Sequence, residues 1–439
     1  MASTTLTRTP SSAGNQKTWT LSAWVKNSYG GMFFCVDSYG ASKSLQSEFY
    51  QGADYFAIAQ YASGSGAWGL TTNRLFRDRN AWYHLVISVD TTQATSSDRV
   101  KIYVNGVQET SFSSETYPSL NYDTGVNTAI QHMIGNRPSA SIYFDGLMAH
   151  FHFIDGTAYD ASDFGETDST SGIWKPKTAP SVTYGTNGFF LKMENSGAMG
   201  TDSSGNSNTF TVSGTLTQNV DTPSNNFATL NPNHQSTYHS TSRATLANGN
   251  TKWTGTSNGT SQNGIISTLG ASKGKFYLEA KWVGTADATI GVAKDNFGMM
   301  TAGTGGLQST GWYGMNTNIS ASGGAGMAWW SNNSATGDRG STISNNDIIM
   351  MAIDIDNNKL YFGINGTWEE SGDPTSGATG TGATSTLASN TTYLVACANY
   401  GYYTANSWEF NFGQGYFGTT VVASAGTAPS EGGIFEYDC

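Results

Sequence analysis

The chain has 439 residues, enough for about three domains of about 150 residues each. Charged residues make up only 12% of the chain and aromatic residues 13%. A disordered chain combines high net charge with few aromatic residues, so this composition predicts a folded protein. The net charge is −11, which repels phosphate backbones and argues against nucleic-acid binding through a basic patch.

No apolar stretch approaches the roughly 20 residues that cross a bilayer. The first residues lack the basic and apolar regions of a signal peptide. The three cysteines, Cys35, Cys397 and Cys439, lie far apart and form no CxxC pair, which favours neither a disulfide framework nor a zinc site. We therefore expect the protein to be made in a reducing cytoplasm.

Apolar residues alternate with polar ones along the first half of the chain. The pattern is clearest over residues 19–26, 82–90, 100–106 and 143–156. Asn105-Gly106, at the end of the third segment, is a strong hairpin signal. Alternation with a period of two is typical of β-strands, and the chain shows no long helical pattern. The sequence therefore predicts an all-β protein.

A second group of strands is predicted over residues 275–282, 347–356, 359–366 and 408–413. The segment 347–356 is apolar on both faces, which is typical of a central strand of a sandwich. The intervening stretch is polar and rich in Asn, Ser and Thr, and it reads as a linker. The predicted organisation is a first sandwich at 1–220, a polar linker at 221–245, a second sandwich at 246–415 and a tail at 416–439.

The order of these segments resembles two known folds. The series WTLSAWVK, WYHLVISVD, DRVKIYVNGVQ and YFDGLMAHFHFIDG resembles laminin-G-like, concanavalin A-like jelly rolls. Residues 184–212 resemble the opening strand of such a domain, and we expect this late segment to complete the first sandwich in a permuted order. The series GKFYLEAKW, TIGVAKDNF, GWYGMN, TYLVACANYG and WEFNFGQ resembles a SPRY domain. The expected fold is two antiparallel β-sandwiches in tandem.

The chain resembles virion structural proteins of marine tailed bacteriophages in the pairing of the two domains and in the segments ASDFGETDSTSGIWKPK and DTPSNNFATLNP. This resemblance implies a non-enzymatic protein on the virion surface, such as a tail fibre, appendage or capsid decoration. It implies other virion proteins as partners, a homo-oligomer, recognition of a host glycan or receptor, and neither nucleic acid nor membrane insertion. The alternative is a carbohydrate-binding lectin or a glucanase-like enzyme that acts on host polysaccharide.

Glycoside hydrolysis needs two carboxyl groups about 5–5.5 Å or about 6.5–9.5 Å apart. The E-x-D-x-x-E pattern of glucanases with this fold is missing from the sequence. The nearest pair, Asp354 and Asp356, would share one strand face, but it precedes a predicted hairpin, and turn chemistry explains both residues. The sequence therefore predicts no catalytic residues.

His150 and His152 also share one strand face, a spacing compatible with a metal ion, although packing against aromatic rings explains them equally well. No cofactor is predicted. Calcium is the metal that suits this fold class best, because such sandwiches often hold a rim ion with Asp and Asn oxygens. The residues that could bind it are Asp37, Asn73 and Asp145. No D-x-D-x-D-G loop accompanies them, so an empty loop is the simpler interpretation.

Aromatic and Asn-rich segments of the second half are the strongest binding signal, because sugars suit aromatic platforms flanked by amides. The predicted ligand-binding residues are Trp312, Tyr313, Asn316, Trp329, Trp330, Arg339 and Tyr402. We expect them in loops, with Trp329, Trp330 and Arg339 as the best single cluster. Core packing or a subunit interface is the alternative role for the same rings. A second location for the site is the first sandwich near Trp68, Asn73 and Arg74.

Overall fold

The computed structural model describes residues 4–36, 43–235, 244–255, 263–284, 288–295, 310–317, 327–332, 334–338, 341–399, 406–425 and 433–437. It divides into two compact units, residues 1–218 with 222–226 and residues 219–221 with 227–439. The two units are β-sandwiches, so the predicted all-β class is confirmed. Among the described residues, no helix has the length and apolar character of a membrane span.

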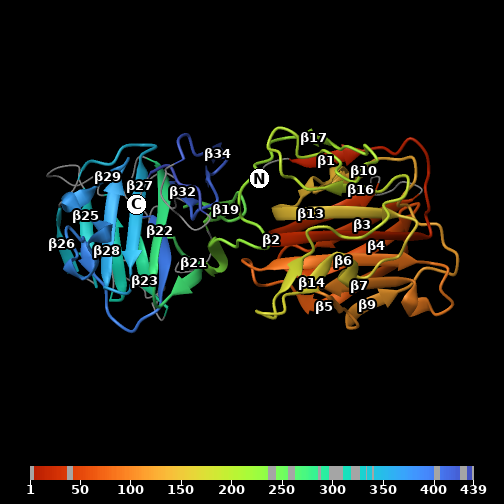
Figure 1. Ribbon diagram of the computed structural model, residues 1–439, viewed down its shortest axis with the longest axis horizontal. Helices are drawn as coiled ribbons and strands as arrows, with labels where there is room; N and C mark the ends of the chain where they lie inside the picture. The colour runs from red at the N-terminus through yellow and green to blue at the C-terminus, as the bar shows by residue number, and fades with distance from the viewer. Residues whose placement is uncertain are drawn as a thin grey trace. The chain divides into compact units, whose positions relative to one another are not determined.

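Unit 1 is a sandwich of two layers that share one long strand. One layer consists of β17 (Thr211–Ser213), β1 (Thr5–Arg8), β10 (His132–Ile134), β2 (Thr18–Val36), β3 (Ser44–Phe49), β4 (Tyr55–Ala62), β5 (Ser65–Leu75) and β9 (Phe112–Thr116), in that order. The other layer consists of β16 (Phe189–Leu191), β13 (Asp145–Asp155), β2, β6 (Trp82–Asp90), β7 (Val100–Val104) and β8 (Val107–Gln108). Figure 1 shows β2, β3 and β4 side by side in the first layer.

Strand β2 passes from one layer to the other at Gly30 and Gly31. Its first half pairs with β6 and its second half with β3. The φ angles of the two glycines are 110° and 117°, a region that other residues rarely adopt. A Cβ atom at Gly31 would lie 2.0 Å from the carbonyl oxygen of Tyr143. The glycine pair therefore permits both the bend and the close approach of the neighbouring chain.

Residues 184–212 complete the first sandwich, as the sequence predicts. Strand β16 pairs with β13, and β17 pairs with β1. Phe189, Leu191 and Phe210 are buried in the core between the layers. The remaining short elements of this unit are β11 (Asn136–Arg137), β12 (Ile142–Tyr143), β14 (Gly165–Thr167), β15 (Trp174–Pro176), η1 (Ser96–Asp98), η2 (Pro138–Ala140) and η3 (Ala161–Asp163).

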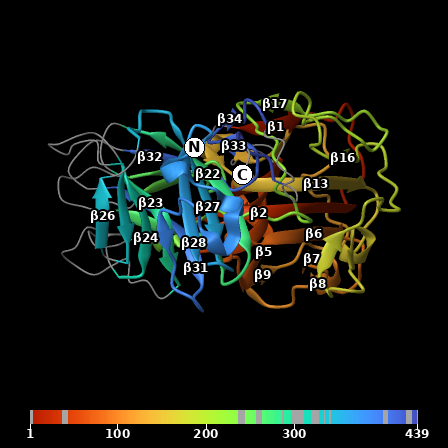
Figure 2. The ribbon, with the colours of Figure 1, turned by 60° about the vertical axis from the view of Figure 1, so that its left-hand side comes forward.

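Unit 2 is a sandwich of two antiparallel sheets. One sheet has the order β18 (Leu230–Gln235), β21 (Gly264–Ala271), β31 (Tyr393–Asn399), β23 (Ala288–Lys294), β24 (Trp312–Asn316), β25 (Ala328–Ser331) and β26 (Ser334–Asp338). The other contains β19 (Thr245–Ala247), β20 (Lys252–Thr254), β32 (Ser407–Asn411), β22 (Lys275–Val283), β27 (Ile348–Asp354), β28 (Lys359–Ile364), β29 (Thr367–Trp368) and β30 (Ser385–Thr386). Figure 2 shows β22, β27 and β28 as neighbours. The short elements are η4 (Glu369–Ser371), η5 (Pro374–Thr379), β33 (Tyr416–Phe417) and β34 (Thr420–Val421).

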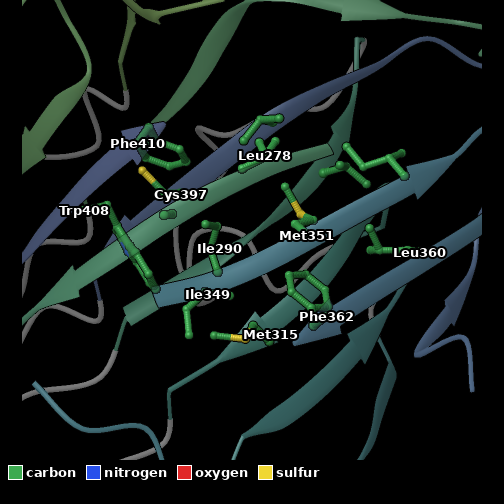
Figure 3. Packing of buried hydrophobic residues seen from close by; sticks show 14 of the residues in the cluster. Leu278, Ile290, Met315, Ile349, Met351, Leu360, Phe362, Cys397, Trp408 and Phe410 are labelled. Carbon is green, nitrogen blue, oxygen red and sulfur yellow. The ribbon is translucent and has the colours of Figure 1, made fainter. Parts of the chain in front are cut away.

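The core of unit 2 lies between these sheets (Figure 3). Ile290 and Cys397 are cross-strand neighbours on one sheet, and Met351 and Phe362 are cross-strand neighbours on the other. All four are buried. Strand β27 lies between β22 and β28 and is buried on both faces, as its continuous apolar sequence predicts.

Two parts of the predicted organisation differ from the structure. The predicted linker at 221–245 contributes β18, which pairs with β21 and brings the buried Leu230 into the core of unit 2. The predicted tail contains β33 and β34, and its residues 433–437 hydrogen-bond to the sheet of β22. The backbone groups of these segments pair with a strand or donate to a buried side chain, which composition does not reveal.

Candidate functional site

The structure places five of the predicted ligand-binding residues on strands and not in loops. Those on β24 and β25 are Trp312, Tyr313, Asn316, Trp329 and Trp330. The first four are buried, and Trp330 is partly buried. Their predicted loop position was therefore wrong. Arg339 and Tyr402 lie outside the described residues.

These rings serve packing on both faces of their sheet. Tyr313 and Trp329 belong to the core between the two sheets. Trp312 lies on the opposite face, fully buried, in a cluster with Ile266, against which Trp330 packs. A Cβ atom at Gly314 would lie 2.5 Å from the Cζ2 atom of Trp312. The indole of Trp312 thus fits over a glycine and is enclosed, so it offers no free platform to a ligand.

The Asp354 and Asp356 carboxyl groups stabilise the end of a hairpin, as the sequence interpretation holds. Asp354 is buried, lies 3.3 Å from the Lys275 ammonium and accepts a 2.8 Å hydrogen bond from the Asn357 amide. Asp356 accepts a 2.8 Å hydrogen bond from the backbone N–H of Gly274. Both carboxylates are thereby engaged in local structure.

His150 and His152 pack among aromatic rings on the outer side of β13. The His152 ring stacks on Phe190 with centroids 3.9 Å apart, and its Nδ1 atom is 2.9 Å from the Tyr184 hydroxyl. Burial lowers the pKa of both histidines. The described part of the chain contains no group of three His, Cys, Asp or Glu side chains placed to hold a metal ion.

Two of the three calcium residues suggested by the sequence lie on strands of unit 1. Asp37 lies outside the described residues. Asp145 begins β13, whereas Asn73 is on β5 and donates a 2.9 Å hydrogen bond to the Ser111 hydroxyl. Strands β13 and β5 do not pair in unit 1.

A groove of about 270 Å³ lies on the outer face of the layer formed by β3, β4, β5 and β9 in unit 1. Successive side chains of a strand point to opposite faces, so every second residue of these strands faces the groove. The lining residues are Tyr50, Ala57, Ile58, Ala59, Tyr61, Gly66, Ala67, Trp68, Gly69, Thr71, Ser114 and Thr116. Most of them are small, and their short side chains leave the hollow.

Tyrosine rings and hydroxyl groups border this floor. Tyr50 is 37% exposed, and its ring stacks on Tyr55 across the β3–β4 hairpin with centroids 4.7 Å apart. Tyr61 lines the groove from the other end of β4. Ser114 and Thr116 on β9 are exposed and add hydroxyl groups. Aromatic faces beside hydroxyl groups suit a ligand that has apolar C–H faces and many polar groups.

A buried acid stands beside the floor of the groove. Glu48 on β3 is opposite Ala57 on β4 and is 7% exposed. Burial raises the pKa of Glu48, and the charge of Arg137 opposes that shift. Among the described residues, Glu48 accepts no hydrogen bond and forms no ion pair, while Arg137 donates a 2.9 Å hydrogen bond to the Gln46 side-chain oxygen. The buried Gln46 Nε2 and Arg137 Nε atoms also lack hydrogen-bond partners.

The groove was missed by sequence reasoning because its floor consists of Ala, Gly and Thr. The second location named from the sequence is nearer to it. Trp68 on β5 contributes to the lining but is 3% exposed, because its ring belongs to the core. Arg74 forms a 2.5 Å ion pair with Glu109. The signal that could have located the groove is the outward row of small residues on β4 and β5.

Comparisons with known proteins agree with this architecture. Residues 2–161 match the family model of the Concanavalin A-like lectin/glucanases superfamily, a laminin G type. No curated protein sequence matches the chain. The family match supports the laminin-G-like resemblance of the first half. The solved structures that resemble the chain include SPRY domains.

Three of these structures differ strongly from the chain in sequence. The SPRY domain of human HERC1 is 12% identical, with 41% of this chain and 96% of that chain covered and a TM-score of 0.28. The TRIM65 PSpry domain is 11% identical, and the match covers 42% of this chain and 87% of that domain with a TM-score of 0.30. The heptameric SAP-like pentraxin from Limulus polyphemus is 12% identical, and the match covers 35% of this chain and 71% of the pentraxin chain with a TM-score of 0.26.

Proposed function

We propose that this protein is a non-enzymatic carbohydrate-recognition protein that binds glycan chains in the groove of unit 1. The observation that carries the proposal is the groove itself, in which tyrosine rings and hydroxyl groups border a floor of small residues. The match of residues 2–161 to a lectin/glucanase family supports the same class of ligand. A sugar ring can lay its C–H face against a tyrosine while its hydroxyls bond to the rim.

Binding is proposed in preference to hydrolysis because of what lines the groove. A glycosidase requires two carboxyl groups on either side of the scissile bond. The lining residues of the groove include neither Asp nor Glu, and the nearby Glu48 stands alone on its strand. The alternative of a glucanase-like enzyme is tested by incubating the protein with host polysaccharide, because only an enzyme releases reducing sugar.

A binding experiment with matched variants tests the groove. Titration calorimetry against a panel of neutral hexaoses should detect binding, and Tyr61→Ala should weaken it at least tenfold, because the ring is part of the wall. Tyr103→Ala is the control, since Tyr103 is partly buried on β7 in the other layer of the sandwich. Equal affinity of the parent and Tyr61→Ala would refute the location, provided that both melt at similar temperatures.

We further propose that the protein is displayed on the surface of a tailed bacteriophage particle, assembled in the host cytoplasm together with other virion proteins and as a homo-oligomer. The support is the pairing of the two domains together with the segments ASDFGETDSTSGIWKPK and DTPSNNFATLNP, which resemble marine phage virion proteins. Labelling of purified particles with an antibody against the chain tests the display, and light scattering at micromolar concentration tests the oligomer. Unlabelled particles or a strict monomer would contradict the respective part.

A further inference from the structure

We infer that Glu48 makes the groove selective for uncharged glycans and excludes acidic ones, such as chains of uronic acids. The inference rests on the proposed function of the groove and adds the class of glycan that it accepts. It starts from a buried carboxyl group next to the binding floor that accepts no hydrogen bond from the described residues.

The register of the strands places Glu48 at the groove. Glu48 is directly opposite Ala57, and Ala57 lines the groove. Side chains of directly opposed residues have Cβ atoms about 4.5–5.5 Å apart on the same face of the sheet. Tyr50, two residues along β3, faces the same side and also lines the groove. Burial raises the pKa of the Tyr50 hydroxyl, and the charge of Glu48 adds to this shift.

A carboxylate in this position needs hydrogen-bond donors. Burial without a donor is costly for an ionised group, and the raised pKa of Glu48 reflects that cost. The hydroxyl groups of a neutral sugar are donors and would relieve it. A uronate or sulfate group would instead bring a second negative charge into a site of low polarity, where like charges repel strongly.

Arg137 does not convert the site into an anion receptor. No ion pair links its guanidinium to Glu48 within the described part of the chain. Its Nη1 atom already donates to Gln46, and its Nε atom is buried. The exposed tyrosines of the groove supply no positive charge either. Glu48, directly opposite the lining residue Ala57, therefore has no hydrogen-bonded cation among the described residues.

The experiment compares sugars that differ only at C6. Cellohexaose is paired with its C6-oxidised uronate form, and β-1,4-mannohexaose with β-1,4-hexamannuronate, and each affinity is measured by calorimetry at pH 7.5. The parent protein should bind a neutral member at least tenfold more tightly than its acidic counterpart. Glu48→Gln should shrink this ratio at least fivefold, by weaker binding of the neutral sugar and stronger binding of the acidic one.

Two controls separate the inference from general charge and from misfolding. Glu115→Gln removes an exposed carboxyl group on β9 and should leave the ratio unchanged. Equal ratios in the parent and Glu48→Gln, with both proteins melting at similar temperatures, would overturn the inference while the proposed function stands. Failure of all four sugars to bind would overturn both.

Discussion

Several hydrogen bonds hold the C-terminal segment 433–437 in unit 2, and one buried carboxylate accepts two of them. Glu279 on β22 is fully buried. Its carboxylate accepts hydrogen bonds from the backbone N–H groups of Glu436 at 2.9 Å and Tyr437 at 2.8 Å. The Tyr277 hydroxyl at 3.0 Å and the Asn411 amide at 3.3 Å donate to the same group. Each carboxylate oxygen of Glu279 accepts two of these four hydrogen bonds, so both oxygens are needed as acceptors.

Glu279→Gln replaces one of these oxygens by an NH₂ group that faces donors. A hydrogen bond to a charged group contributes about 1.5–3 kcal/mol. The variant weakens two such bonds, while Ile434 keeps its bonds to Asn411 and Gly413. Because the freed N–H groups return to water, we expect the docked state to lose about 2–4 kcal/mol. A loss of about 1.4 kcal/mol changes the equilibrium constant between the docked and undocked segment tenfold. The amides of residues 436 and 437 should therefore exchange with solvent roughly 30- to 900-fold faster.

Hydrogen exchange read out by mass spectrometry on a C-terminal peptide measures this effect directly. Glu370→Gln, an exposed acid in η4 of the same unit, is the matched control and should leave the exchange rates unchanged. If the C-terminal amides of Glu279→Gln stay as protected as those of the parent, the segment is held by its apolar contacts and the reasoning fails.

Three further predictions follow from buried groups. Burial lowers the pKa of His84 to about 3 and that of His132 to about 4, so the unfolded chain binds protons that the folded chain excludes. The free energy of unfolding should therefore fall by about 1.4 kcal/mol per pH unit for each histidine as the pH drops from about 6.5 towards 4. A free energy of unfolding that stays constant over this pH range in urea titrations would contradict the prediction. Trp312→Ala should cost about 3–5 kcal/mol of unfolding free energy in denaturant titrations without changing glycan affinity, because it empties an enclosed site. Cys35 and Cys397 are buried thiols, so a thiol reagent should label them only in denaturant and a reductant should not shift the melting temperature. Rapid labelling of the native protein would disprove their burial.

Much of the architecture can be predicted from the sequence, because the signals are local. Alternation identifies β6 and β22, where one face is buried in the core. The turns Asn105-Gly106 and Asn365-Gly366 have positive φ angles at both residues, as type I′ hairpins require. The completion of unit 1 by residues 184–212 follows from resemblance and is confirmed by the pairing of β16 and β17. What fails is the 221–245 linker, since β18 pairs through its backbone.

The position of the aromatic residues shows why the site is harder to predict than the fold. Trp312 and Trp330 stand in short strands between Gly- and Ser-rich stretches, so no long alternation reveals that they are strand residues. A tryptophan in such a stretch looks like an exposed platform. In the structure a glycine row lets the rings lie flat on the sheet, and packing explains them fully. Composition alone cannot distinguish a ring that covers a sheet from one that contacts a ligand.

The groove of unit 1 presents the opposite case, because a hollow is made by side chains that are missing. Ala57, Ala59 and Gly69 form its floor, and none of them carries chemistry of its own. They become a site only when the register places them in adjacent rows, with Glu48 at one end. An acid on an outward face is normally exposed, so its burial without a hydrogen bond can be recognised only in three dimensions. A binding site of this kind depends on register and not on any one motif, which is why strand pairing must be known before its chemistry can be read.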